Sequence, residues 1–268
     1  MTSPDIDPTT SVAPLIPDDT LFPDDTLFPD DTLFPDDTAR PEVVAEVTGA
    51  PLAVFDLDRT LHAGSGLGVL ARHAFRHRLI GPERMARSFV HDLVFRRRGS
   101  TDDHTNTIAE LALDMAGGTT LAELAPVVEA TAQQIASTVR PSVLDLLRRH
   151  QAAGHYCVVL SASPQLLVER IGEILDVPCS VGTRIEERNG TLTGRIIPPM
   201  AYGHGKLDRL QSVIGWPDAG AEPTTTYAYA DSMSDLPLLE AVDAPIVVAP
   251  ERKLRTLAYE RRWPIIDF

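Results

Sequence analysis

The chain has 268 residues, 43% of them hydrophobic, and no apolar run approaches the roughly 20 residues that span a bilayer. Its net charge of −14 and the lack of a recognisable DNA- or RNA-binding module argue against nucleic acid as a partner. Two isolated cysteines, Cys157 and Cys179, indicate buried thiols in a reducing compartment. With no basic and apolar leader, we expect a cytoplasmic protein of one large or two small domains.

The N-terminal segment is acidic and repetitive. Residues 17–38 contain Pro-Asp-Asp-Thr-Leu-Phe three times, followed by a partial fourth copy. Residues 1–40 hold ten aspartates and one arginine, a charge of −9. Each unit carries two acids, a proline and no base, so it cannot bury enough apolar surface to fold. We predict a disordered tail over 1–48; the alternative is a docking segment whose Leu-Phe pairs bind a partner that the sequence does not identify.

The first motif with chemical content is a strand that ends in two acids. The apolar run 52–55 predicts a buried strand, followed by Asp56 and Asp58. Alternate residues of a strand point to the same side, and open α/β sheets bind ligands at the carboxyl ends of their strands. Both carboxylates are therefore expected to face one site. A solvated turn after a buried strand is the alternative for this segment alone.

Residues 67–154 predict helices. Apolar stripes at helical spacing lie in 67–75, 85–94 and 108–115. A capping box at 120–123 begins the next helix, and Pro141 begins a last one that Gly154 ends. These stripes predict a helical cap inserted after the first motif.

The first half of this predicted cap is basic. Residues 62–98 contain eight arginines against two acids. A solvated face is the simpler interpretation, above all for residues 96–98. One or two of four other arginines would instead pair with an anionic substrate group: Arg72, Arg76, Arg84 and Arg87.

Three more polar clusters follow in a regular order. The apolar run 156–160 predicts a strand that ends at Ser161-Ala162-Ser163-Pro164, with Pro164 suited to begin a helix. A helix at about 164–176 and a hairpin around 189–190 fill the interval before Lys206, which lies at the start of a helical pattern. The third strand, 225–230, runs into Asp231 and Asp235.

These residue types suit phosphoryl transfer assisted by Mg²⁺. A carboxylate nucleophile splits one displacement into two easier steps, and a second carboxylate can give and take the proton. Mg²⁺ prefers oxygen ligands, and a lysine offsets the charge on phosphoryl oxygens. Only two lysines occur in the chain, Lys206 and Lys253, so a lysine at this position is more than chance favours. An exposed first-turn lysine and cap or turn roles for Ser161 and Asp235 are the structural alternatives.

Over residues 50–268 the order of these motifs resembles the haloacid dehalogenase superfamily, closest to subfamily IB with the phosphoserine phosphatases. The resemblance implies an α/β, Rossmann-like core with a parallel sheet, formed by 49–66 and 155–268, and a helical cap at 67–154. It implies a Mg²⁺-dependent phosphatase that acts on a small phosphorylated metabolite, with no stable membrane insertion.

The resemblance also assigns roles to residues. The nucleophile, the general acid/base and the neutralising cation are Asp56, Asp58 and Lys206. The phosphoryl group is held by Ser161 and the backbone N–H of Ala162, with Thr60 supporting the loop. The metal site is formed by Asp56, Asp58, Asp231 and Asp235.

The chain departs from the family pattern at the substrate end. Phosphoserine phosphatases carry a glutamate about nine residues past the nucleophile, where this chain has Ser65, so we predict a substrate other than phosphoserine. Arg59 and Ala230 replace residues that are often small, and neither is expected to carry chemistry. The alternatives are a phosphotransferase or mutase on the same core, and a non-enzymatic regulator that binds a partner.

Overall fold

The computed structural model describes residues 40–80, 117–217 and 220–268, all within one compact unit that spans Asp37–Phe268. The acidic repeats, the predicted helical stripes 85–94 and 108–115, and the arginines at 84, 87 and 96–98 lie outside the described residues.

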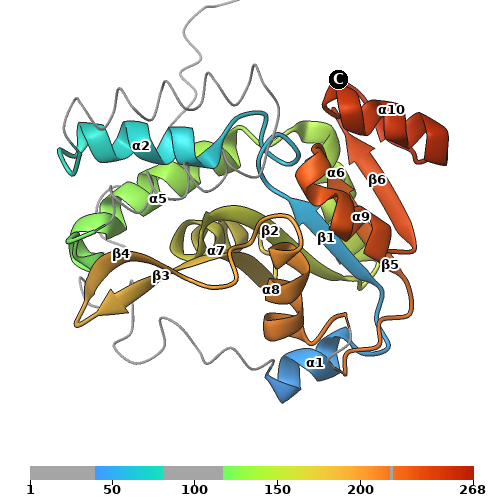
Figure 1. Ribbon diagram of the computed structural model, residues 1–268, viewed down its shortest axis with the longest axis horizontal. Coiled ribbons are helices and arrows are strands. Elements are labelled where there is room, and N and C mark those ends of the chain that lie inside the picture. The colour runs from blue at the N-terminus through green and yellow to red at the C-terminus, as the bar shows by residue number, and fades with distance from the viewer. Residues whose placement is uncertain (1–39, 81–116, 218–219) are drawn as a thin grey trace, which may run out of the picture. The chain divides into compact units, whose positions relative to one another are not determined.

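In the described part of the chain, seven strands form one sheet in the order β4-β3-β2-β1-β5-β6-β7 (Figure 1). The strands are β1 (Leu52–Asp56), β2 (Tyr156–Pro164), β3 (Cys179–Arg188), β4 (Thr191–Ile197), β5 (Thr226–Ala230), β6 (Ala244–Val248) and β7 (Ile265–Ile266). Neighbours are parallel except β3 and β4, which pair antiparallel. The predicted α/β class with a mostly parallel sheet is confirmed.

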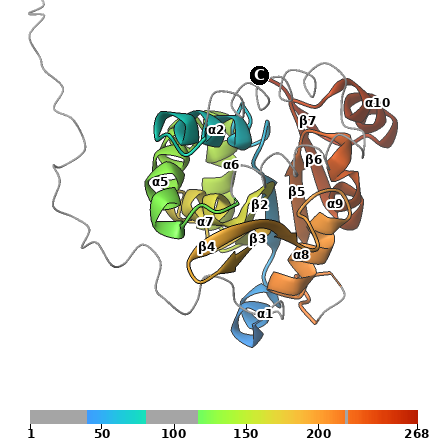
Figure 2. The same ribbon diagram turned by 60° about the vertical axis from the view of Figure 1, so that its left-hand side comes forward.

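Helices cover both faces of the sheet (Figure 2). The helices are α1 (Pro41–Val47), α2 (Gly66–Arg76), α5 (Leu121–Ser137), α6 (Pro141–Ala152), α7 (Gln165–Ile174), α8 (Gly205–Ile214), α9 (Leu236–Ala241) and α10 (Arg252–Arg261), with a short 3₁₀ helix, η1 (Met233–Asp235). Helices α1, α8, α9 and α10 contribute to the core on one face, and α5, α6 and α7 to the core on the other. All five residues of β1 are buried, as a strand covered on both faces requires.

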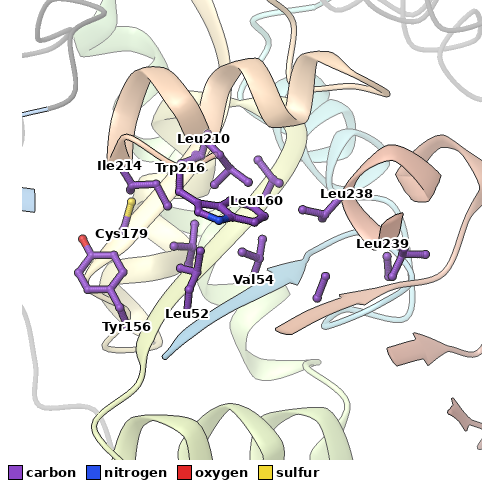
Figure 3. Packing of buried hydrophobic residues seen from close by; sticks show 14 of the residues in the cluster. Leu52, Val54, Tyr156, Leu160, Cys179, Leu210, Ile214, Trp216, Leu238 and Leu239 are labelled. Atoms are coloured by element: carbon purple, nitrogen blue, oxygen red, sulfur yellow. The ribbon is translucent and has the colours of Figure 1, made fainter. Parts of the chain in front are cut away.

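The core beneath α8 and α9 is built from aliphatic residues around one tryptophan. Trp216 lies among Leu52, Val54 and Leu160 of the sheet and Leu210 of α8 (Figure 3). Cys179 is part of this cluster and Cys157 of the opposite one, and both are free buried thiols as predicted. None of the helices in the described ranges has the length and hydrophobicity to span a bilayer.

Local signals placed several elements correctly. Thr120 and Glu123 form both hydrogen bonds of a capping box at the start of α5. The hairpin between β3 and β4 turns at Asn189 and Gly190, which have φ angles of 53° and 74°. Pro164, expected to begin a helix, is instead the last residue of β2, and α7 starts one residue later.

Helix α6 was predicted to be part of the cap, and this boundary is corrected. Its buried residues Val143 and Leu147 pack with Phe55 of β1 and Val159 of β2, in the core of the sheet. Periodicity shows that one face of a helix is buried but not which element covers it. Helices α2 and α5 also lie in the predicted cap, and they share a small cluster that includes Ala71, Ala74 and Val127. Both helices contribute buried residues to the core of the sheet as well.

Helix α1 lies inside the range predicted to be a disordered tail, and it belongs to the folded unit. Val47 is fully buried, and Val43 and Val44 pack against the same core cluster. Deleting residues 1–47 should lower the unfolding free energy by about 2 kcal/mol, the order of magnitude for one buried valine. Deleting only 1–39 should leave the melting temperature unchanged, because the repeats have no apolar core to contribute. Equal melting temperatures for the two deletions would contradict the assignment of α1.

A buried histidine of α6 should make stability depend on pH. His150 bonds through Nε2 to the Tyr229 hydroxyl at 2.8 Å and through Nδ1 to Nδ1 of His155 at 2.7 Å. Burial, followed by the nearby charge of His155, lowers the pKa of His150 to about 4 from its ordinary 6.5. The unfolded chain therefore binds the proton first, and folding stability is lost as the pH falls from about 6.5 to about 4.

The variant His150→Gln, which cannot titrate, tests this expectation. Over that pH range the wild type should lose roughly 2 kcal/mol more unfolding free energy than the variant in urea titrations. Groups that do not contact His150 titrate alike in both proteins and cancel in the comparison. The same pH dependence in both would show that His150 is not responsible.

Candidate active site

Three adjacent parallel strands carry the predicted polar residues to one edge of the sheet. Asp56 is the last residue of β1 and pairs with Leu160 of β2, so that Ser161 follows directly beside it. On the other side, Phe55 pairs with Tyr229 of β5, and Asp231 comes immediately after that strand. Parallel strands end at a common edge, which is why residues 175 positions apart in the sequence converge.

A group of buried carboxylates forms the centre of this edge. Asp56, Asp231 and Asp235 each offer an oxygen within 4.8 Å of the others, and their exposed fractions are only 2–4%. Lys206, from the first turn of α8, is buried with them. Its Nζ donates to Asp56 Oδ1 at 2.7 Å and also to Asp235 Oδ1. The structure thus brings together four residues that the sequence predicted for the site.

Burial and like charges control the ionisation of this group. Burial, together with Asp235 and Asp58, raises the pKa of Asp56 to about 7, against the opposing charge of Lys206. Burial likewise raises the pKa of Asp231 well above its usual range. Burial alone would lower the pKa of Lys206, but the charges of Asp235 and Asp56 outweigh it, and the pKa is raised. Lysine therefore stays protonated, and the site favours additional positive charge.

Asp235 is oriented by a serine that sequence reasoning missed. The Ser232 hydroxyl donates to Asp235 Oδ2 at 3.0 Å, while Oδ1 accepts from Lys206. Asp235 stands at the N-cap position of α9, but its side chain caps no N–H of that helix. The Asp235 carboxylate therefore does not cap α9, which was the structural alternative.

Arg59 supplies a second cation that the sequence did not predict. Its Nε lies 2.9 Å from Asp231 Oδ2, and its backbone has a left-handed φ of 63°. That conformation favours glycine and costs an ordinary residue about 1–2 kcal/mol. Nothing in the sequence marks the position, because neither the backbone angle nor the partner after β5 can be read from residues 56–60. Arg59 was expected to carry no chemistry, and its ion pair with Asp231 was not predicted.

Asp58 lies beside the three carboxylates but faces another set of partners. Its Oδ2 accepts from the hydroxyls of Ser161 at 3.0 Å and Ser163 at 3.3 Å, and its Oδ1 accepts from the backbone N–H of Gly66. Among the described residues, its carboxylate is not part of the group that could hold a metal. Three donors direct this carboxylate toward β2 and α2. The predicted metal-binding role of Asp58 stays a prediction.

The roles predicted for Thr60 and Ala162 stay predictions. Thr60 is fully buried in the loop after β1, and its hydroxyl has no hydrogen-bond partner within the described residues. Backbone bonds from Leu61 to the Asp56 carbonyl and from His62 to the Leu57 carbonyl hold this loop. Ala162 follows Ser161 in β2, where pairing with β3 is irregular between Leu160 and Pro164.

The donor set fits a hard divalent cation. When all are ionised, the three carboxylates carry one more negative charge than Lys206 and Arg59 balance. The atoms that could bind a metal are all oxygens. Mg²⁺ prefers oxygen ligands, whereas zinc sites usually include nitrogen or sulfur. The cluster could therefore hold a metal ion that prefers oxygen ligands.

Comparison with known proteins agrees with this geometry. The model of the haloacid dehalogenase-like hydrolase family matches residues 53–240. A probable phosphatase of Mycobacterium tuberculosis is 30% identical over 81% of this chain and 75% of its own length. A phosphoserine phosphatase of the same organism is 31% identical over 81% of this chain and 70% of its own length. The crystal structure of a protein of unknown function from Bordetella pertussis is 31% identical, with a TM-score of 0.71, over 82% of this chain and 99% of that one.

The family match covers more than half of the chain and includes Asp56, Lys206 and Asp235, so the same residues carry the resemblance and the geometry. The chain belongs to the haloacid dehalogenase-like hydrolase family.

Proposed function

We propose that this protein is a Mg²⁺-dependent phosphatase that hydrolyses a small phosphomonoester through a phosphorylated Asp56. The observation that carries the proposal is the contact of Asp56 Oδ1 with Lys206 Nζ at 2.7 Å, beside two more buried carboxylates. A carboxylate is a competent nucleophile only when ionised, and a permanently charged lysine at this distance favours that form.

The residues divide the reaction into two steps. Asp56 attacks the phosphorus, the bond to the ester oxygen breaks, and Asp58 gives its proton to that leaving oxygen. Water then attacks the phosphorus of phospho-Asp56 and gives a proton to Asp58, which releases phosphate and restores the Asp56 carboxylate. Lys206 neutralises charge on the phosphoryl oxygens throughout, and the Ser161 hydroxyl can turn from Asp58 to one of these oxygens.

Asp56, Asp231 and Asp235 would hold the Mg²⁺ ion. When bound, the ion neutralises these carboxylates and the phosphoryl group that approaches them. Arg59 pairs with Asp231 when no ion is bound. This ion pair would break when Asp231 binds the metal.

Ser65 supports the prediction against phosphoserine. Its hydroxyl accepts the backbone N–H of Gly68 at 3.3 Å, so Ser65 caps α2. A carboxylate that could recognise an amine is missing from this position. The phosphomonoester is then expected to lack a recognised α-amine, and a screen of phosphorylated metabolites would identify it.

Metal binding should stabilise the folded protein, because a ligand of the native state shifts the unfolding equilibrium. At a Mg²⁺ concentration 100 times the Kd, the gain is about 2.7 kcal/mol. The variant Asp231→Asn should melt at a similar or higher temperature in EDTA, because burial makes the Asp231 charge unfavourable. It should gain little from Mg²⁺ and turn over poorly. Calorimetry of both proteins in EDTA and in millimolar Mg²⁺ tests this, and an equal response of the two would remove Asp231 from the site.

Turnover of p-nitrophenyl phosphate in Mg²⁺ tests the proposed activity itself. Release of p-nitrophenol that needs Mg²⁺ supports a phosphatase. Adding acceptor alcohols separates the two enzymatic alternatives, because a phosphotransferase would form the phosphorylated alcohol in place of free phosphate.

A further inference from the structure

Ser163 lies next to the general acid of the proposed reaction and has no part in the mechanism above. Its side chain is 1% exposed, and its hydroxyl donates to Asp58 Oδ2 at 3.3 Å. The Ser161 hydroxyl donates to the same oxygen at 3.0 Å, and the backbone N–H of Ser163 donates to Ser161 Oγ at 3.0 Å. One carboxylate oxygen is thus held by two serines of β2.

A serine hydroxyl has one proton, so it can donate to one acceptor at a time. When Ser161 donates to a phosphoryl oxygen, it can no longer donate to Asp58. Ser163 is then the hydroxyl that keeps Oδ2 in place, while the Gly66 N–H keeps Oδ1. Two donors on one oxygen therefore allow Ser161 to change partner without releasing the general acid.

The space around Gly66 agrees with this arrangement. A Cβ atom at position 66 would lie 3.1 Å from Ser163 Oγ and 3.2 Å from Asp58 Oδ1, closer than most Cβ contacts in proteins. Gly66 is also the first residue of α2, which Ser65 caps, so the helix presents its N–H to Asp58. A side chain at position 66 would therefore crowd both the serine hydroxyl and the carboxylate.

We propose that Ser163 is a positioning residue that, with the Gly66 amide, holds the Asp58 carboxylate against the leaving oxygen of the substrate. This inference rests on the proposed function, in which Asp58 is the general acid. The contribution of Ser163 to the rate should depend on the leaving group, because a leaving oxygen that is stable as an anion needs no proton.

The experiment compares two aryl esters of nearly equal size in Mg²⁺. Phenolate needs a proton to leave much more than p-nitrophenolate does. The ratio kcat/KM reports the steps up to formation of phospho-Asp56, which include departure of the aryl group. With Ser163→Ala, kcat/KM should fall about tenfold more for phenyl phosphate than for p-nitrophenyl phosphate, since a hydrogen bond is lost to a carboxyl group that becomes charged as it gives up its proton. Ser163→Thr keeps the hydroxyl and should recover most of this difference.

Two further variants complete the test. Ser212→Ala removes a half-buried hydroxyl that donates to the Arg209 carbonyl in α8, and it should leave both kcat/KM values unchanged. Gly66→Ala crowds the same carboxylate and should reproduce the selective loss of kcat/KM on phenyl phosphate. This variant can be measured if Ser163→Ala does not fold. An equal loss on both esters, or no recovery in Ser163→Thr, overturns the role of Ser163 alone. No turnover of either ester by the wild type overturns the proposed function, and this inference with it.

Discussion

Replacing Asp56 with asparagine should lower kcat by at least three orders of magnitude while the protein remains folded, about the cost of losing a covalent route. Asparagine has the same shape, and Lys206 keeps its contact with Asp235, so the buried group loses one negative charge and no cation. Burial already raises the pKa of Asp56 to about 7, which means that removing its charge does not destabilise the fold.

The matched control for this variant is Asp208→Asn, the same chemical change at an exposed position in the first turn of α8. It should keep wild-type kcat and KM. Unfolding in urea checks that both variants are as stable as the wild type. Residual activity of Asp56→Asn above roughly 1% would point to another nucleophile, because a lost covalent route costs more than that.

Replacing Lys206 with methionine should damage both activity and stability. The side chain keeps a similar length, but Asp56 and Asp235 lose the cation that contacts both. Breaking a buried ion pair by removing one partner costs about 3–5 kcal/mol, since an uncompensated charge remains. We expect kcat/KM to fall by about 10²-fold or more, because the lysine charge no longer offsets the phosphoryl charge.

The stability of the Lys206→Met variant should depend on pH in a definite direction. Without Lys206 the carboxylates should protonate at higher pH, so the unfolding free energy of the variant should fall as the pH rises through neutrality. The chain offers one matched control, Lys253→Met, at the exposed second residue of α10. That variant should resemble the wild type in both measurements. Similar losses in the two variants would show that the position of Lys206 has no special role.

The sequence predicted the site best where the pattern itself determines the geometry. Buried runs that end in polar residues indicate parallel strands, and parallel strands of one sheet end at a common edge. This is why Asp56 and Asp231 could be placed together from the strand pattern, whereas the family resemblance placed Lys206 and Asp235 with them. The predicted alternation of Asp56 and Asp58 is less accurate, because β1 ends at Asp56 and the chain turns before Asp58.

What the sequence did not predict depends on contacts between distant segments. Ser163 meets Asp58 only because β2 lies beside β1, and the Arg59 side chain reaches Asp231 from a left-handed residue. Helical periodicity could not distinguish a helix packed on the sheet from a helix of the cap, which led to the wrong boundary at α6. Phe75, expected on a buried stripe, is 41% exposed in the described structure.

In the proposed reaction the phosphoryl group passes through Asp56, and this intermediate can be trapped. The protein would be mixed with p-nitrophenyl phosphate and Mg²⁺, quenched in acid during turnover and reduced with borohydride, which converts an acyl phosphate to an alcohol. Peptide mass spectrometry should then find homoserine at position 56 in the wild type, and none in a sample quenched without substrate. Reduction at another aspartate, phosphate on Ser161, or turnover with Asp56 never modified would contradict the account.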